Sequence, residues 1–180
     1  MGSLFASSAI AALPGAAWPR FFYVPSVNTD VVIRPQRPDH PQVAAALAAL
    51  DAYLASLYEP EANHILSIAE LLAPEVSFFA VWQDERVVGT GAVRRMASER
   101  SAEIKRMYVD PESRRQGLGS CLVAALEASM REQGVALVRL ETGAAQGEAV
   151  RLYERCGYSR CGAFGGYPDN GLSLFFEKRL

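Results

Sequence analysis

The stretch that decides the fold runs from Glu103 to Ser120 and reads EIKRMYVDPESRRQGLGS. Its first half is a strand-like run, and its second half is an Arg-x-x-Gly-x-Gly loop that opens a helix. The first amides of a helix have no partner within the helix and carry partial positive charge. Glycines at 117 and 119 let this backbone approach an anion closely, and Arg114 and Arg115 add charge. The segment therefore predicts a strand–loop–helix site for a pyrophosphate.

The strand in this stretch changes parity before it reaches the loop. Ile104 and Met107 are apolar and three positions apart, whereas residues on one face of a strand are an even number apart. A β-bulge between them would explain the slip. The bulge would splay this strand from a parallel neighbour expected at 135–140. An extended, amide-bearing arm could then pair with the backbone groups left in the gap.

The elements on both sides complete one α+β domain. The expected strands are 31–33, 76–82, 86–97, 102–109, 135–140, 158–163 and 172–177. The expected helices are 40–58, 62–72, 117–133 and 147–155. The order predicts a mixed, mostly antiparallel sheet with one parallel pair, formed by a βαβ crossover over 102–140. Residues 30–180 form this domain, and we expect 1–29 to be a poorly ordered N-terminal extension.

The composition excludes several classes of protein and partner. The chain has 180 residues, 50% of them hydrophobic, which fits one domain with a single core. Its formal charge of −2 gives no basic field for nucleic acid, and no apolar stretch is long enough to span a membrane. Three cysteines without zinc spacing predict no metal and a reducing, cytoplasmic location. The loop lacks the Gly-Lys-Ser/Thr of a nucleotide P-loop, and Leu122 stands where a dinucleotide fingerprint has its third glycine.

Two patterns together resemble one family. The first is RMYVDPxxRRxGxG from Arg106 to Gly119, and the second is AVxLYExxGY from Ala149 to Tyr158. They resemble the GNAT superfamily of acyl-CoA-dependent N-acetyltransferases, with matching element order from Val31 onward and specific motifs over 103–158. The resemblance implies a GNAT-like sheet flanked by helices, with one splayed parallel pair. It also implies direct attack by a primary amine of a small molecule, amino acid or peptide on acetyl-CoA in a ternary complex.

The resemblance also assigns site residues. It makes Tyr153 the general acid that protonates the departing thiolate, and Glu103 the base, acting directly or through water. It gives the contacts with the CoA arm to Gln146, where the family often has Asn, and to Met107, Tyr108 and Val109. It implies that the CoA pyrophosphate binds the backbone amides of Arg114, Arg115, Gln116, Gly117, Leu118, Gly119 and Ser120. An amide in the bulge would polarise the thioester carbonyl.

Plainer interpretations stay open for the same residues. Glu103 could be a solvated strand residue, Tyr153 a core aromatic, the glycines turn residues and the paired arginines a solvated surface. Arg106 could pair with Glu103 or anchor a substrate carboxylate. Cysteine catalysis is disfavoured, because both histidines lie in the N-terminal helical region, away from the cysteines.

Alternatives also stay open for the protein as a whole. It could be a non-catalytic acyl-CoA sensor or interaction module on the same fold, or it could transfer a longer acyl group. Acidic groups near 59–64 and in the turn 166–170 would favour a cationic amine acceptor. An exposed final strand at 172–176 would allow a homodimer.

Overall fold

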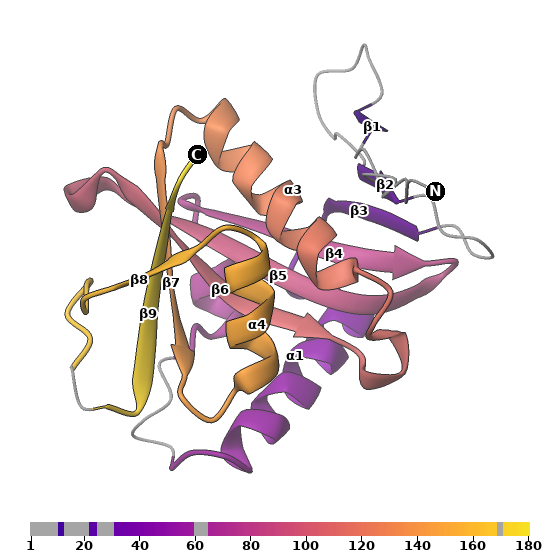
Figure 1. Ribbon diagram of the computed structural model, residues 1–180. Helices are drawn as coiled ribbons and strands as arrows, with labels where there is room; N and C mark the ends of the chain where they lie inside the picture. The colour runs from indigo at the N-terminus through magenta and orange to yellow at the C-terminus, as the bar shows by residue number, and fades with distance from the viewer. Residues whose placement is uncertain (1–10, 13–21, 25–30, 60–64, 169–170) are drawn as a thin grey trace, which may run out of the picture.

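The computed structural model describes residues 11–12, 22–24, 31–59, 65–168 and 171–180 (Figure 1). The strands are β1 (Ala11–Ala12), β2 (Phe22–Val24), β3 (Val31–Pro35), β4 (Val76–Gln83), β5 (Arg86–Met96), β6 (Ser101–Val109), β7 (Leu137–Gly143), β8 (Ser159–Cys161) and β9 (Ser173–Arg179). The helices are α1 (Pro41–Ala55), α2 (Ile68–Leu71), α3 (Leu118–Glu132) and α4 (Gly147–Arg155). Two short 3-10 turns, η2 (Ala97–Glu99) and η3 (Pro111–Ser113), flank β6.

All these strands form one sheet in the order β1-β2-β3-β4-β5-β6-β7-β9-β8. Neighbouring strands pair antiparallel except β6 and β7, which are parallel. α3 joins the parallel strands, which makes β6-α3-β7 a βαβ crossover. The predicted mixed, mostly antiparallel sheet with one parallel pair is therefore confirmed.

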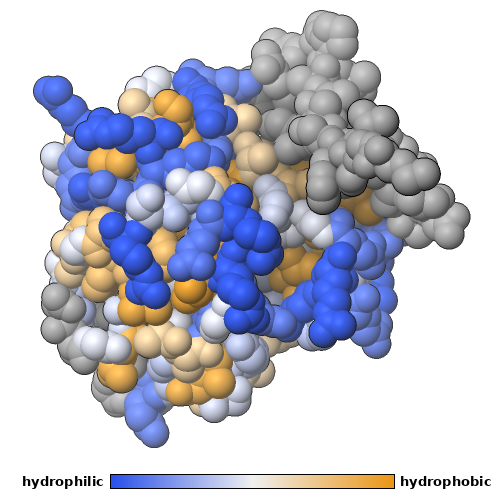
Figure 2. Space-filling model, viewed as in Figure 1, coloured by the Kyte–Doolittle hydropathy of each residue, from blue (hydrophilic) through white to orange (hydrophobic). Residues whose placement is uncertain are grey.

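Helices cover both faces of the sheet, with α3 and α4 on one face and α1 on the other (Figure 1). Adjacent residues of β4 alternate between the two cores: Phe79 and Val81 join the cluster around α3, and Phe78 and Ala80 join the cluster around α1. A strand buried on both faces has no polar side, which is why β4 reads as a continuous apolar run. The outer surface over α3 and α4 is mostly hydrophilic, with smaller apolar patches between the polar side chains (Figure 2).

Local hydrogen bonds shift several element boundaries from those predicted. α1 ends at Ala55 rather than 58, where the Ser56 hydroxyl donates to the Tyr53 carbonyl at 2.6 Å. β7 starts at Leu137 rather than 135, because Val135 donates to the Met130 carbonyl at 3.0 Å and completes the end of α3. Gly134, at φ +74°, supplies the left-handed turn that this ending needs.

The second predicted helix is much shorter than expected. The expectation was 62–72, and α2 covers only Ile68–Leu71, while residues 60–64 lie outside the described ranges. Ser67 and Glu70 form a reciprocal capping box, in which each side chain accepts from the other residue's backbone amide. This box fixes the start of the helix at Ile68.

The expectation of a poorly ordered extension over 1–29 falls largely outside the described residues. The two described pieces are the strands β1 and β2, which continue the sheet beyond β3. No strand is expected there from the sequence, so β1 and β2 add to the predicted sheet. Among the described residues, no helix has the length and hydropathy needed to cross a bilayer.

Candidate active site between the splayed strands

The predicted bulge lies in β6 opposite Gly91. Ala92 pairs with Lys105 and Thr90 pairs with Tyr108, so Gly91 of β5 faces two residues of β6. One of the two is Arg106, whose φ of +57° is unusual for a residue with a side chain. The Thr90 hydroxyl donates to the Arg106 carbonyl at 3.3 Å. This bond satisfies a carbonyl that the bulge removes from the regular hydrogen bonding between β5 and β6. The slip in parity between Ile104 and Met107 is therefore a β-bulge, as predicted.

The parallel strands separate immediately after this point. β6 pairs with β7 only from Ala102 to Ile104, opposite Val138 to Leu140. Both strands continue, β6 to Val109 and β7 to Gly143, without pairing to each other. Backbone groups on the facing edges of these segments are therefore available to an extended ligand between them.

A cavity of about 550 Å³ lies along this gap. Its walls include the end of β6, the loop and first turn of α3, the end of β7, the inner face of α4 and the last turns of α1. It brings together most of the predicted site residues: Met107, Tyr108, Val109, Arg114, Arg115, Gly117, Leu118, Gly119, Ser120, Gln146 and Tyr153. Gln116 and Glu103 do not line it.

The loop before α3 has the geometry expected of an anion site. Gly117 is the N-terminal cap of α3 at φ +81°, and a Cβ there would meet nothing within 4 Å. The first hydrogen bond of the helix runs from Cys121 to the Gly117 carbonyl, so the amides at 118–120 precede the helical ladder. Gly119 has a different role, because a Cβ there would lie 3.1 Å from Leu152 of α4. One glycine shapes the turn and the other lets two helices approach.

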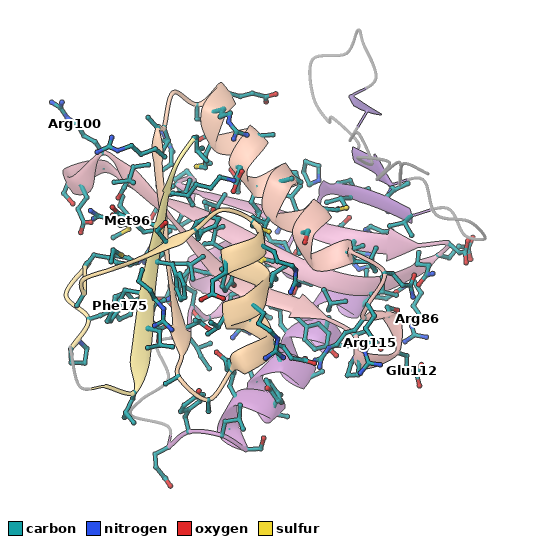
Figure 3. All side chains as sticks on the ribbon, in the orientation of Figure 1. Arg86, Met96, Arg100, Glu112, Arg115 and Phe175 are labelled. Carbon is teal, nitrogen blue, oxygen red and sulfur yellow. The ribbon has the colours of Figure 1, made fainter. Side chains whose placement is uncertain are left out.

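The two arginines of the loop differ in how they are held. The Arg114 side chain donates to the Val109 carbonyl at 3.1 Å and to Glu148 at 3.2 Å, which ties the loop to β6 and α4. Arg115 has a φ of +65°, is exposed, and forms no ion pair with another described residue. Figure 3 shows Arg115 on the segment that leads into α3. Arg115 is thus the more available of the two for a bound anion.

Tyr153 lies on the buried face of α4 and also reaches the cavity. It is 5% exposed, and its ring packs against Tyr158 and Phe176 with centroids 6.0 and 6.3 Å away. Burial raises the pKa of Tyr153 well above its usual value. The phenol therefore stays protonated across the neutral range, as a proton donor must. Tyr153 is both a core aromatic and a wall of the cavity.

Comparison with known proteins agrees with this geometry. Residues 45–158 match the model of the acetyltransferase (GNAT) family. This chain belongs to the GNAT family of acetyltransferases. An IAA acetyltransferase of Azospirillum brasilense is 35% identical over 84% of this chain and 99% of its own length. The Bacillus subtilis N-acetyltransferase YsnE is 30% identical over 67% of this chain and 81% of its own.

Solved structures of the family share the fold. A Klebsiella pneumoniae protein, assigned as an acyl-CoA N-acyltransferase, is 37% identical and has a TM-score of 0.72 over 83% of this chain and 97% of its own. The PaiA N-acetyltransferase of Thermoplasma acidophilum, solved with coenzyme A, has a TM-score of 0.66 over 83% of this chain and 99% of its own. At 19% identity the second likeness concerns the fold alone.

In this acetyltransferase Gln146 braces the end of β7. Its side-chain oxygen accepts from the Gly143 amide and from the Thr142 hydroxyl, each at 2.9 Å. The residue also lines the cavity. Its contact with the CoA arm stays a prediction.

Glu103 is fully buried and lies in a network of charged groups outside the cavity wall. Arg94 and Lys105 donate to its carboxylate at 3.2 and 3.3 Å, and the Tyr167 hydroxyl donates at 2.5 Å. Lys105 also donates to the Tyr167 oxygen at 2.6 Å. Glu103 is therefore not a solvated strand residue. Its role as the base stays a prediction, and these partners leave it no direct exposure to the cavity.

Glu141 is a carboxylate of the cavity wall that the sequence analysis did not single out. It follows Leu140, the last residue of β7 paired with β6, and the Ser173 hydroxyl donates to it at 2.6 Å. The feature of the sequence that could have identified Glu141 is a single acidic residue near the end of the strand Leu137–Gly143. This feature is weak evidence, because the neighbouring residues in the sequence do not show which face of the strand borders a cavity.

Tyr58, which follows α1, crosses to the end of β7. The Ala145 amide donates to its hydroxyl at 3.1 Å, and burial raises the pKa of Tyr58. A Cβ on Gly143 would collide with that hydroxyl, so Gly143 makes room for the ring. Tyr58 therefore links the α1 wall of the cavity to the β7 wall.

Arg106 does not pair with Glu103. Its guanidinium turns to Asp51 of α1, because the left-handed backbone of the bulge takes its side chain out of the strand's alternation.

The acidic segments expected to favour a cationic acceptor lie partly at 60–64 and 169–170, outside the described residues. In the described ranges, no cluster of three or more histidine, cysteine or acidic side chains is arranged to hold a metal.

Proposed function

We propose that this protein transfers an acetyl group from acetyl-CoA to the primary amine of a small molecule, an amino acid or a peptide. The observation that carries the proposal is the separation of β6 and β7 beyond Ile104 and Leu140, which forms a cavity that reaches the first turn of α3. Both ends of this cavity suit acetyl-CoA: unpaired strand edges for the amide-bearing arm, and helix amides with Arg115 for the pyrophosphate.

The reaction follows from the groups that line the cavity. The amine nitrogen attacks the thioester carbonyl carbon, a C–N bond forms, and negative charge develops on the carbonyl oxygen. A backbone amide of the bulge would stabilise that charge, a role that costs no rearrangement because β5 and Thr90 hold the bulge. The C–S bond then breaks with its electron pair on sulfur, and the Tyr153 hydroxyl supplies the proton that the thiolate takes up. The attacking nitrogen releases one proton to solvent as the amide forms, and solvent returns a proton to Tyr153.

An ammonium ion has no lone pair, so the acceptor must lose a proton before it attacks. Two carboxylates are candidates for the proton acceptor. Glu103 corresponds to the position expected from the family, and its buried partners require it to act through water or through Tyr167. Glu141 lines the cavity and needs no relay. We therefore propose Glu141 as the direct acceptor and Glu103 as the alternative.

The test is release of CoA thiol from acetyl-CoA with a panel of amines. Turnover with any amine, together with the acetylated product by mass spectrometry, supports the proposal. Tight CoA binding with no turnover across the panel would instead indicate an acyl-CoA sensor on the same fold. Faster release from a longer acyl-CoA would change the donor but not the reaction.

A matched pair of variants tests the site itself. Gly117→Trp should abolish CoA binding, because an indole would cover the amides at the start of α3. Gly134→Trp is the control, since Gly134 also has a left-handed φ and open surroundings but lies at the other end of α3. Calorimetric titration with CoA should show binding in the Gly134 variant only; binding by the Gly117 variant would refute the loop assignment.

A cytoplasmic location and a homodimer also stay predictions. The final strand is not the open edge expected for a homodimer, because β9 lies between β7 and β8 and pairs with both. All three cysteines are unpaired, as a reducing compartment would allow. Size-exclusion chromatography with light scattering would measure the oligomeric state.

A further inference from the structure

We infer that the acceptor carries a carboxylate close to its amine and that Arg106 binds this carboxylate; the inference deepens the proposed acetyl transfer and rests on it. Arg106 lines the cavity at the bulge, where β6 leaves β7. When acetyl-CoA lies between β6 and β7, its thioester would be attacked near this bulge. The acceptor amine must therefore reach the bulge.

The guanidinium of Arg106 is buried but only partly paired. Its side chain is 5% exposed, and its ion pair is made through Nη1 with Asp51, which is 45% exposed. Nε is buried and has no hydrogen-bond partner among the described residues. Asp51 is the one side chain among the described residues that Arg106 pairs with.

The unused part of this guanidinium has a defined chemical preference. Nε and Nη2 form the side edge of the fork, which matches the two oxygens of a carboxylate. A buried donor without a partner is costly, so a ligand that supplies an acceptor there gains affinity. Asp51 is bound through Nη1, which leaves Nε and Nη2 for a second acceptor.

The neighbouring cation is less suited to this role. Lys105 also lines the cavity and is 8% exposed, but its ammonium donates to Glu103 and to the Tyr167 hydroxyl. These two acceptors already neutralise and orient it. Among the described residues at this end of the cavity, Arg106 is therefore the cation with hydrogen-bonding capacity to spare.

The opposite strand supplies the complementary charge. Glu141 follows Leu140, and Arg106 lies two residues beyond Ile104, the partner of Leu140. The cation Arg106 on β6 and the carboxylate Glu141 on β7 thus lie just beyond the last pair of residues that joins these two strands. An acceptor with its ammonium and carboxylate a few bonds apart would place the first at Glu141 and the second at Arg106. This pattern matches a free amino acid better than an internal lysine of a protein.

The wall beside Arg106 indicates the rest of the acceptor. Leu50, Leu54 and Ile65 line the cavity near α1, and Tyr53 adds an aromatic ring. An apolar side chain would bury surface against them. The inferred class is therefore a small amino acid, with an apolar side chain preferred.

The experiment compares common L-amino acids, each beside its own α-carboxamide, which keeps the amine and removes the charge. Binding to the CoA-loaded protein is measured by calorimetry, and kcat/KM by CoA release. We expect the acids to exceed their amides by roughly 10- to 100-fold in both, the range of a bidentate charge-assisted pair. Arg106→Gln should bring that ratio close to one.

Two controls show whether the effect belongs to this side chain. Arg95→Gln removes an exposed arginine of the neighbouring strand that does not line the cavity, and it should keep the wild-type ratio. Calorimetry with CoA alone should give the same affinity for Arg106→Gln as for wild type, which shows that the fold and the CoA site persist.

The outcomes separate this inference from the proposed function. If no acid binds or reacts better than its amide in the wild-type protein, the carboxylate inference is wrong, even where amines are acetylated. If acids bind in a way that needs Arg106 but no CoA is released, the inference holds and the proposed acetyl transfer fails.

Discussion

At the scale of single residues, the pair Tyr153 and Tyr158 gives a matched test of the general acid. Both rings are buried in the same core and contact each other, but only Tyr153 lines the cavity. Tyr153→Phe should lower kcat by about 100-fold, the usual contribution of a positioned acid, while affinity for acetyl-CoA hardly changes. Tyr158→Phe should keep kcat near the wild-type value. Steady-state kinetics and acetyl-CoA titrations would measure both, and an unchanged rate in Tyr153→Phe would remove its role.

The two carboxylates are distinguished by the same approach. Glu141→Gln removes an acceptor of the cavity wall, so kcat/KM should fall by about 100-fold at neutral pH and recover somewhat as solution hydroxide rises. Glu103→Gln leaves Lys105 and Arg94 without their buried counter-charge, so its main effect should be a loss of stability. pH–rate profiles and denaturant titrations of both variants are the measurements. A larger catalytic loss in a stably folded Glu103 variant would make Glu103 the base.

At the scale of elements, the bulge depends on the strand beside it. A Cβ on Gly91 would lie 2.8 Å from the Met107 sulfur and 3.1 Å from Leu122, so a larger residue opposite the two bulged residues would force these side chains to move. The Thr90 hydroxyl and the left-handed backbone of Arg106 hold the same deviation. β5 therefore fixes where β6 bends away from β7, and that bend sets where the cavity opens.

α3 and α4 meet in a similar way. Gly119 brings Leu152 of α4 against the first turn of α3, which places Tyr153 next to the same cavity as the anion loop. The Arg114–Glu148 ion pair links the loop before α3 to the first turn of α4, with both side chains more than a third exposed. Exposed pairs of this kind add little stability, so close packing at Gly119 is the main constraint on how the helices meet.

At the scale of the whole molecule, we expect the buried phenols to reduce stability at alkaline pH. Burial is the main cause that raises the pKa values of Tyr153, Tyr158 and Tyr167 far above the unfolded value of about 10. When the pKa of a group is higher in the folded protein than in the unfolded chain, its contribution to stability is fully present below the unfolded pKa. That contribution is lost as the pH rises from the unfolded pKa toward the folded pKa. Each such group lowers the free energy of unfolding by up to about 1.4 kcal/mol per pH unit above pH 10.

Tyr158→Phe isolates one of these contributions. The Tyr158 hydroxyl is buried and has no hydrogen-bond partner in the described part of the chain, so its removal should leave stability at pH 7 unchanged or slightly higher. Between about pH 10 and 11.5 the variant should lose stability less steeply than the wild-type protein. Urea unfolding at a series of pH values measures both slopes. Parallel slopes would mean that Tyr158 does not titrate through unfolding.

The sequence by itself determined the features that neighbours along the chain encode. The parity slip in β6 and the order of the elements from β3 onward each depend on residues a few positions apart, and the structure confirms them. The same holds for α4, whose predicted bounds of 147–155 are those observed.

Only the tertiary structure decided how the charged side chains are used. Glu103 is bound by Tyr167, 64 residues away, and Arg106 by Asp51, 55 residues away. Glu141 reaches the cavity only because the pairing of β6 with β7 stops at Leu140, the residue before it. Periodicity and backbone conformation are local, so a sequence displays them directly. The partner of a buried charge is set by which distant elements pack together, and that depends on the whole fold.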